Sequence, residues 1–248
     1  MLLIWIISFS LLGSIGAVAL AGTYLMFPER IRQNLITCLI SYATGTLLGA
    51  AFLGLLPHAL SHARASSILP TVLAGIVGFF LMEKIVIWRH CHDLNCKRHS
   101  NAGALLLIGD AIHNFVDGLA IAAAFIASIP VGVTTALAVL AHELPQELGD
   151  FAILLKSGYP RRRAVMYNLL SSLTTLPGAL LAYYLLITSQ VLAPYIMAVS
   201  AASFIYIAIA DLIPGLHDQT EAKQSVSQLM FVLAGIGTIA LFHPTGSA

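Results

Sequence analysis

Five carboxylates inside long apolar stretches constrain this chain more than any other feature. They are Asp110, Asp117, Glu143, Glu147 and Asp150. The sequence has no Lys or Arg between residues 103 and 155 to balance them. One ionised carboxylate in hydrocarbon costs about 2.5–3.5 kcal/mol even on a lenient insertion scale, so five unpaired ones would cost more than about 10 kcal/mol. We therefore expect these groups to face a bundle interior, next to protons, water or bound cations.

The apolar stretches themselves predict a polytopic membrane protein. Of its 248 residues, 58% are hydrophobic and 9% are charged, and the mean hydropathy is +0.90, which is too apolar for a soluble globular domain. The stretches suit helices of about 20 residues and lack the alternation of a β-barrel. We expect an all-α fold with eight transmembrane helices in a single bundle, and one membrane domain over residues 1–248. The lipid bilayer is then a partner, and the scattered basic residues predict no nucleic-acid partner.

The spans alternate with loops of unequal charge. Their rough ranges are 2–27, 34–60, 69–89, 164–187, 191–213 and 229–243, with the fourth and fifth spans between residues 103 and 155. The odd-numbered loops hold ten basic residues: Arg30, Arg32, Arg89, Lys97, Arg98, Lys156, Arg161, Arg162, Arg163 and Lys223. The even-numbered loops hold only Arg64. Basic loops stay in the cytoplasm, so both termini are predicted to be extracytoplasmic. We expect a multi-pass protein of the bacterial inner membrane, with an organelle membrane as the alternative.

Helical spacing gathers the polar side chains of spans four and five on facing surfaces. At about 100° per residue, Asp110, His113 and Asp117 share one face of span four. Span five has a matching face of His142, Gln146 and Asp150, with Glu143 and Glu147 on the adjoining ridge. Imidazole, amide and carboxylate groups that meet in one pocket are typical of a site for a borderline divalent cation.

The types of ligand narrow the choice of metal. Spans four and five contain no Cys or Met, which argues against copper(I), and the imidazoles argue against magnesium and calcium. Zinc is the first expectation, as a transported substrate, followed by iron(II), manganese or cadmium. The ligands must lose protons to bind, so binding should weaken at acid pH.

Other interpretations stay open for several of these residues. His142 and Glu143 begin an HExxH-like motif, in which Glu is the general base of a zinc hydrolase, but Gln146 stands where the second His would be. A metal-sensing or purely structural membrane protein is a third class. Pro145 is either a kink or a source of a freed carbonyl ligand. Asp110, Glu147 and Asp150 are outer ligands, stations on a metal path or proton carriers, or they simply bond to Ser and Thr on other spans.

The motifs His113-Asn-Phe-Val-Asp117-Gly and His142-Glu-Leu-Pro-Gln-Glu-Leu-Gly-Asp150 resemble those of the ZIP (Zrt/Irt-like) family of divalent metal transporters. The resemblance is greatest to the branch with HExPHExGD in its fifth span. It extends to residues 45–58 and 204–214, and to a loop after span three that holds His90, Cys91, His92, Cys96 and His99. That loop either captures metal in the cytoplasm or is simply solvated.

The resemblance implies a transporter that moves metal into the cytoplasm through a paired-metal site between spans four and five, with one helix group sliding against another. His113, Asp117, His142 and Gln146 would form the primary site. Asn114 and Glu143 would serve a second site, with Asp117 as a bridge. A homodimer is compatible with these spans.

Two departures from the family pattern make the expected site poorer in ligands. Gln146 stands where the branch has a second histidine, and Ala50 and Gly54 stand where relatives often place an acidic residue and a histidine.

A short pattern also repeats within the chain, as Gly54-Leu-Leu-Pro57 near the end of span two and Asp211-Leu-Ile-Pro214 near the end of span seven. Repeated halves are common among transporters.

Overall fold

Long apolar runs leave the backbone few choices in a bilayer, because every N–H and C=O group must be satisfied within the chain. The computed structural model describes residues 1–88, 100–217 and 222–242, and within these ranges the chain is helical without strands. The elements are α1 (Leu2–Leu11), η1 (Leu12–Gly16), α2 (Ala17–Tyr24), α3 (Glu29–Gly49), η2 (Ala50–Leu55), α4 (Leu56–His62), α5 (Ala65–Trp88), α6 (Ser100–Ala127), α7 (Ile129–Lys156), α8 (Arg161–Ser172), α9 (Thr175–Thr188), η3 (Gln190–Leu192), α10 (Ala193–Tyr206), η4 (Ile207–Leu212), α11 (Ile213–His217) and α12 (Ala222–Phe242). The all-α membrane fold is thus confirmed.

Seven helical runs in the described part of the chain are long and apolar enough to cross a membrane. They are Leu2–Tyr24, Glu29–His62, Ala65–Ile85, Leu106–Ala127, Arg161–Thr188, Gln190–His217 and Gln224–Phe242. α7 has 28 residues but is not among them, because its polar residues lower its hydropathy. The expected count of eight spans therefore depends on α7 and stays a prediction.

Several boundaries differ from the sequence expectation. α3 begins at Glu29 rather than near residue 34, and α12 begins at Ala222 rather than near 229, so part of the expected polar loop is helical. Polar residues continue a helix beyond the apolar core wherever its ends reach water, and hydropathy alone cannot detect this. The turn between α6 and α7 is as short as expected. Ser128 caps α7 there by accepting a hydrogen bond from the Val131 backbone N–H at 3.3 Å.

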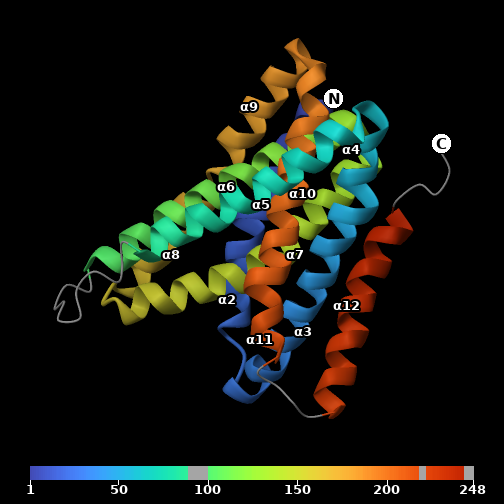
Figure 1. Cartoon of the computed structure of the whole chain (residues 1–248). Helices are drawn as coiled ribbons and strands as arrows, with labels where there is room; N and C mark the ends of the chain where they lie inside the picture. Colours follow the sequence, from blue (N-terminus) through green and yellow to red (C-terminus); the bar gives the residue numbers. More distant parts are fainter. Residues whose placement is uncertain (89–99, 218–221, 243–248) are drawn as a thin grey trace.

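Close helix contacts hold the bundle together. A Cβ added to Gly118 of α6 would collide with the carbonyl oxygen of Thr175 at the start of α9. A Cβ on Gly45 of α3 would likewise collide with the carbonyl of Val232 in α12. Small residues permit this approach, which gives van der Waals contact in the absence of a hydrophobic driving force between helices. Figure 1 shows α12 beside α3 at one edge of the bundle.

The short repeated pattern has a structural counterpart. η2 and η4 are both π-helical segments of six residues, and each ends two residues before a proline, Pro57 or Pro214. A helical proline has no N–H and its ring crowds the carbonyl four residues earlier. In both repeats that carbonyl, of Leu53 or Ala210, lies inside the wider π-helical turn, which makes room for the ring. The runs α3–α4 and α10–α11 therefore accommodate their prolines in the same way, through a π-helical segment.

Candidate metal centre

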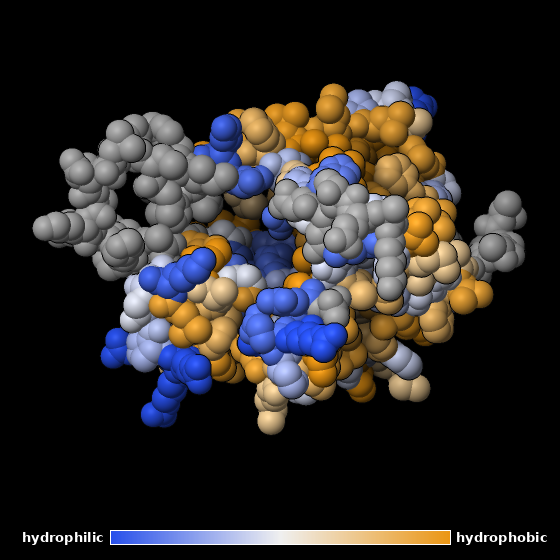
Figure 2. All heavy atoms as spheres, turned by 90° about the horizontal axis from the view of Figure 1, so that it is seen from below, coloured by the Kyte–Doolittle hydropathy of each residue, from blue (hydrophilic) through white to orange (hydrophobic). Residues whose placement is uncertain are grey.

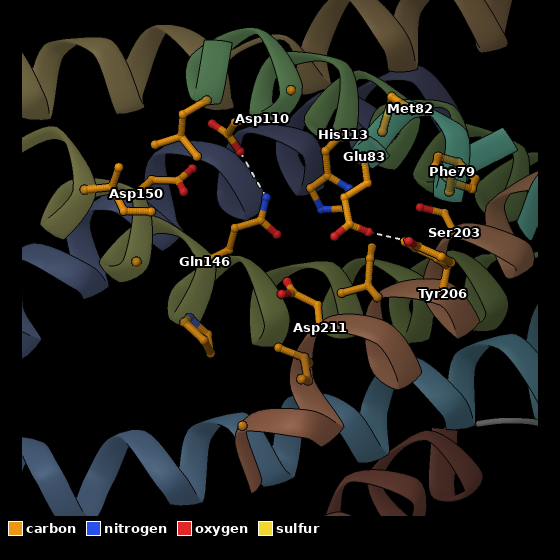
Figure 3. A pocket seen from close by; sticks show the side chains of 18 of the residues that line it. Phe79, Met82, Glu83, Asp110, His113, Gln146, Asp150, Ser203, Tyr206 and Asp211 are labelled. Atoms are coloured by element: carbon orange, nitrogen blue, oxygen red, sulfur yellow. Dashed lines mark hydrogen bonds between the residues drawn. The ribbon is translucent and has the colours of Figure 1, made fainter. Parts of the chain in front are cut away.

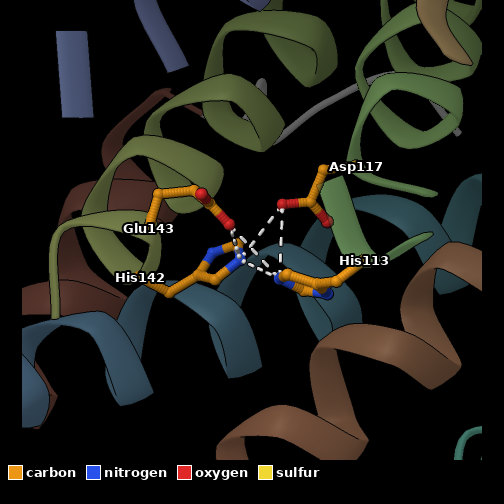
Figure 4. A group of neighbouring side chains, drawn as sticks. All are labelled: His113, Asp117, His142 and Glu143. Carbon is orange, nitrogen blue, oxygen red and sulfur yellow. Dashed lines mark hydrogen bonds and ion pairs between the residues drawn. The ribbon is translucent and has the colours of Figure 1, made fainter. Parts of the chain in front are cut away.

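The centre is formed by α6 and α7, which pack side by side in the middle of the bundle. His113 and Asp117 are one turn apart on α6, while His142 and Glu143 are consecutive on α7. All four side chains are buried, with relative exposures of 7% for His113 and 1% or less for the other three. Their carboxylate and imidazole ligand atoms all lie within 4.8 Å of one another (Figure 4). We call these four residues the quartet.

The imidazoles occupy the middle of the quartet. His142 Nε2 lies 3.1 Å from Asp117 Oδ2, 3.5 Å from Glu143 Oε1 and 3.1 Å from His113 Nε2. His113 Nε2 lies 3.3 Å from Glu143 Oε1 and 3.8 Å from Asp117 Oδ2. Two nitrogens and two carboxylate oxygens therefore point at a common small space, as Figure 4 shows.

A backbone contact sets the tautomer of one imidazole. His142 Nδ1 lies 2.9 Å from the carbonyl oxygen of Ala138. Because a carbonyl oxygen only accepts hydrogen bonds, Nδ1 carries the proton and Nε2 keeps its lone pair. That lone pair is directed at the other members of the quartet, as in metal sites whose histidines are oriented through the opposite ring nitrogen.

The carboxylates of the quartet lack the partners that buried charges need. Apart from their contacts with the imidazoles, both oxygens of Asp117 and both of Glu143 are buried without a hydrogen bond. Burying such groups is costly unless a cation or protons offset the charge. A mixed set of imidazole nitrogens and carboxylate oxygens, with unsatisfied oxygens, fits a borderline divalent cation such as zinc.

A second polar group lies beside the quartet. Asp110 Oδ1 accepts hydrogen bonds from Asn114 Nδ2 at 3.0 Å and from Gln146 Nε2 at 3.1 Å. Asn114 Oδ1 in turn accepts one from the Thr175 hydroxyl of α9 at 3.0 Å. Both the nitrogen and the oxygen of the Asn114 amide are thus hydrogen-bonded, whereas Gln146 is hydrogen-bonded to Asp110 through its nitrogen. The structure brings Asp110, Asn114 and Gln146 together next to the quartet. Gln146, which we expected in the primary site, thus lies beside the quartet, and Glu143, which we expected at the second site, lies within it.

Glu147 points a different way. Its Oε1 accepts a hydrogen bond from the Ser172 hydroxyl of α8, and its backbone carbonyl accepts one from Asn168 Nδ2 at 3.0 Å. Oε2 is buried without a hydrogen bond. Among the expectations for Glu147, bonding to a Ser of another span is therefore the one that the geometry matches.

A cavity of about 490 Å³ adjoins the centre. It is lined by Asp110, His113, Gln146 and Asp150 from the centre's own helices, together with Glu83 of α5 and Asp211 of η4 (Figure 3). Its walls come from the late parts of α5, α7 and α10–α11 and the early part of α6, so it occupies the half of the bundle next to the odd-numbered loops. Figure 2 views the molecule from below and shows a hollow in this end with hydrophilic residues in its depth.

Two polar residues of this cavity were missed by sequence reasoning. The Tyr206 hydroxyl donates a hydrogen bond to the carboxylate of Glu83, which links α10 to α5 across the cavity wall (Figure 3). The contact joins residues 123 positions apart, so no local pattern could reveal it. The only available signal was an acidic residue inside an apolar span. The loop with His90, Cys91, His92, Cys96 and His99 lies outside the described residues.

Comparison with known proteins gives the chain's relationships. A family model described as "ZIP Zinc transporter" matches residues 87–243, more than half of the chain. Zinc transporter ZIP13 of Pongo abelii is 34% identical over 261 residues, which cover 94% of this chain and 77% of that protein. Zinc transporter zipt-7.2 of Caenorhabditis elegans is 32% identical over 82% of this chain and 57% of its own length.

Other relatives match over a shorter region. Zinc transporter ZIP10 of Homo sapiens is 43% identical over 157 residues, which are 60% of this chain but 19% of that protein. The chain thus spans less than two thirds of several relatives that it matches. These relatives are named as transporters, so they speak against the intramembrane hydrolase as an interpretation of His142 and Glu143. The region matched by the family model and the similarity to ZIP13 over 94% of the chain show that this chain belongs to the ZIP family of zinc transporters.

Proposed function

We propose that this protein carries zinc, or else iron(II), manganese or cadmium, across its membrane into the cytoplasm through the centre between α6 and α7. The observation that carries the proposal is the quartet, in which two imidazoles and two carboxylates point at one space with no Lys or Arg between positions 103 and 155. A divalent cation is the simplest partner for two buried carboxylates. The relatives that are named zinc transporters support zinc as the first substrate.

His113, Asp117, His142 and Glu143 are the proposed ligands of the first ion. Mixed nitrogen and oxygen ligands hold a borderline ion less permanently than a closed thiolate site would, which suits an ion in transit. A second ion would use Asn114 and Gln146 together with Asp110. Asn114 Oδ1 would offer its second lone pair while it keeps the hydrogen bond from Thr175, and Gln146 can keep its bond to Asp110 and offer its carbonyl oxygen.

The direction of transport is inferred from the cavity. It lies in the half of the bundle next to the odd-numbered loops, where ten basic residues favour the cytoplasm. Asp150 and Asp211 line this cavity, and their carboxylates would attract a cation released from the quartet towards the cytoplasmic side. This conformation would then be the one that delivers metal to the cytoplasm, with both termini extracytoplasmic. The relatives named above are eukaryotic, so the bacterial inner membrane stays a prediction.

Uptake of radioactive zinc into proteoliposomes tests the proposal. Asp117→Asn keeps the shape of the side chain but removes its charge, and we expect it to abolish uptake. His142→Gln should do the same, because it removes the nitrogen nearest to Asp117 Oδ2. The matched control is Glu29→Gln, which removes an exposed carboxylate from an ion pair with Arg32 at the start of α3. Exposed pairs contribute little to stability, so uptake by this variant should equal that of the wild type.

Zinc uptake by Asp117→Asn and His142→Gln at the wild-type rate would overturn the proposal. Circular dichroism and the elution volume of each variant in detergent serve to confirm that the fold is retained. Reconstituting the protein with its odd-numbered loops facing outward and inward, and measuring flux from each side, tests the direction.

A further inference from the structure

A second pair of imidazoles lies away from the quartet, on α4. His58 and His62 are four residues apart, so they share one face of the helix. Their rings stack with centroids 4.2 Å apart and an interplanar angle of 24°. His58 is half-buried and His62 is exposed, so solutes can reach the pair. Two histidines at this spacing on one helix face are the arrangement from which many zinc sites take two ligands.

Hydrogen bonds already fix the orientation of His62. Its Nδ1 lies 3.0 Å from the carbonyl oxygen of His58 and 2.9 Å from the hydroxyl of Ser61. The Ser61 hydroxyl itself donates to the His58 carbonyl at 2.8 Å. Because the carbonyl can only accept, Nδ1 of His62 carries the proton and Nε2 keeps the lone pair that a metal requires. The ring is therefore held in a metal-binding tautomer by contacts that do not use that lone pair.

The electrostatic setting favours a cation at this position. α4 ends at His62, and it closes a helical run that begins at Glu29. The carbonyl groups at a helix C-terminus carry partial negative charge, which favours a cation close to the last turn. Arg64 follows the helix and opposes this effect, but it is exposed, so solvent and salt screen its charge.

The pair also lies on the far side of the quartet from the cavity. α4 lies near the end of the bundle at which α1 begins, as Figure 1 shows. The cavity is lined by residues of the opposite half, such as Ile153 near the end of α7 and Gly215 in α11. η2 joins α4 to α3 and packs against α7, the helix that carries His142. The pair and the cavity thus lie on opposite sides of the centre.

We propose that His58 and His62 form a surface site for zinc, completed by water, at the end of the bundle opposite the cavity. Binding at this site does not depend on transport. Its role rests on the proposed function: the site would hold zinc at the membrane face from which ions travel to the quartet.

Footprinting with diethyl pyrocarbonate, which attacks the unprotonated nitrogen of histidine, tests binding directly. The full-length wild-type protein in detergent is modified with and without zinc, and each histidine is quantified by mass spectrometry. We expect zinc to slow the modification of His62, and we expect this protection to be lost in His58→Gln. His217 is exposed at the end of α11 and serves as an internal control, which zinc should leave unchanged. Magnesium prefers oxygen ligands and should not protect His62.

Two results would overturn the site: His62 reacting equally fast with and without zinc, or protection of His62 that persists in His58→Gln.

A transport assay tests the role of the site separately. His58→Gln should raise the zinc concentration for half-maximal uptake and leave the maximal rate unchanged. An unchanged half-saturation would overturn that role. If Asp117→Asn leaves uptake intact while zinc still protects His62, the proposed transport centre fails and the surface site stands.

Discussion

Gln146 faces the cavity one helical turn after His142, and its side-chain nitrogen is bound to Asp110. An amide is a neutral and weak ligand in comparison with imidazole. The centre therefore has one strong metal ligand fewer than it would have with a histidine at position 146. Asp110 orients two amides at once, because its Oδ1 accepts from Asn114 as well. We therefore predict that the affinity for metal depends on Gln146, which borders the quartet without belonging to it.

Gln146→His should raise the affinity for zinc. The new imidazole would stand on the same helix face as His142 and add a nitrogen donor to the centre. We expect the dissociation constant to fall by about tenfold, which corresponds to about 1.4 kcal/mol. Isothermal titration of the purified protein with zinc measures the change, and Gln146→Asn, which keeps the amide, is the control. Equal or weaker binding by Gln146→His would show that this position does not contribute to the centre.

The composition of the centre was predictable, but the partner of each residue was less so. The lack of Lys and Arg between residues 103 and 155 indicated a cation near the carboxylates. The helical spacing placed His113, Asp117 and His142 on facing surfaces, but it left Glu143 on an adjoining ridge, and the structure brings Glu143 into the quartet. The same spacing put Glu147 on a ridge beside them, yet its carboxylate bonds to Ser172 of α8. Glu83 similarly bonds to Tyr206 of α10. Both choices depend on which distant helix packs against the residue, and periodicity within one helix carries no such information.

α6 and α9 behave as one packed element. Gly178 of α9 approaches the carbonyl of Phe115 on α6, just as Gly118 of α6 approaches the carbonyl of Thr175. Thr174 reinforces the contact by donating a hydrogen bond to the Ala111 carbonyl at 2.6 Å. The helix that supplies His113 and Asp117 is thus held tightly along the face away from α7.

Gly118→Ala should destabilise the protein. The added methyl group would force α6 and α9 apart, and overpacking of this kind typically costs about 1–3 kcal/mol. A lower midpoint of thermal unfolding in detergent is the expected result. The matched control is Gly78→Ala in α5, where an added Cβ meets nothing within 4 Å. There, the better helix propensity of alanine should hold or slightly raise the midpoint. Equal midpoints for the two variants would contradict the close packing of α6 on α9.

Element boundaries were the weaker part of the sequence prediction. The cores of the predicted spans coincide with helices, because apolar length is a strong signal in a membrane protein. The start of α12 was placed too late, since Lys223 and Gln224 look like loop residues. The π-helical turns before Pro57 and Pro214 could not be assigned either. The repeated pattern indicated that the two spans are related, but it carried no information on how the backbone makes room for each proline ring.

For the molecule as a whole, the relevant balance is between metal and protons. The quartet contains two imidazoles and two carboxylates, and all four must be deprotonated to act as ligands. Lowering the pH supplies protons that compete with the metal, so the sign is fixed: acid weakens binding. A change of pH near neutrality alters mainly the protonation of imidazole, whose ordinary pKa is about 6.5.

Zinc affinity should therefore fall between pH 7.5 and 5.5. Linkage predicts a slope of about one logarithmic unit per pH unit for each proton that zinc displaces. Titration with zinc at several pH values measures the slope, and Glu29→Gln should follow the wild type because its carboxylate lies far from the centre. A constant affinity across this range would mean that imidazoles do not hold the metal.

The single residue between α6 and α7 has a mechanical consequence. Ser128 alone joins the end of α6 to the start of α7, so the two helices can pivot relative to each other about this residue. Measured along the helices from this turn, the quartet lies about 20 Å away, and Asp110 and Asp150 lie about 26–32 Å away. If the angle between the two helices widens slightly, the cavity residues therefore separate further than the ligands of the quartet do. We expect that such a movement would open the cavity while the distances between the ligands increase less.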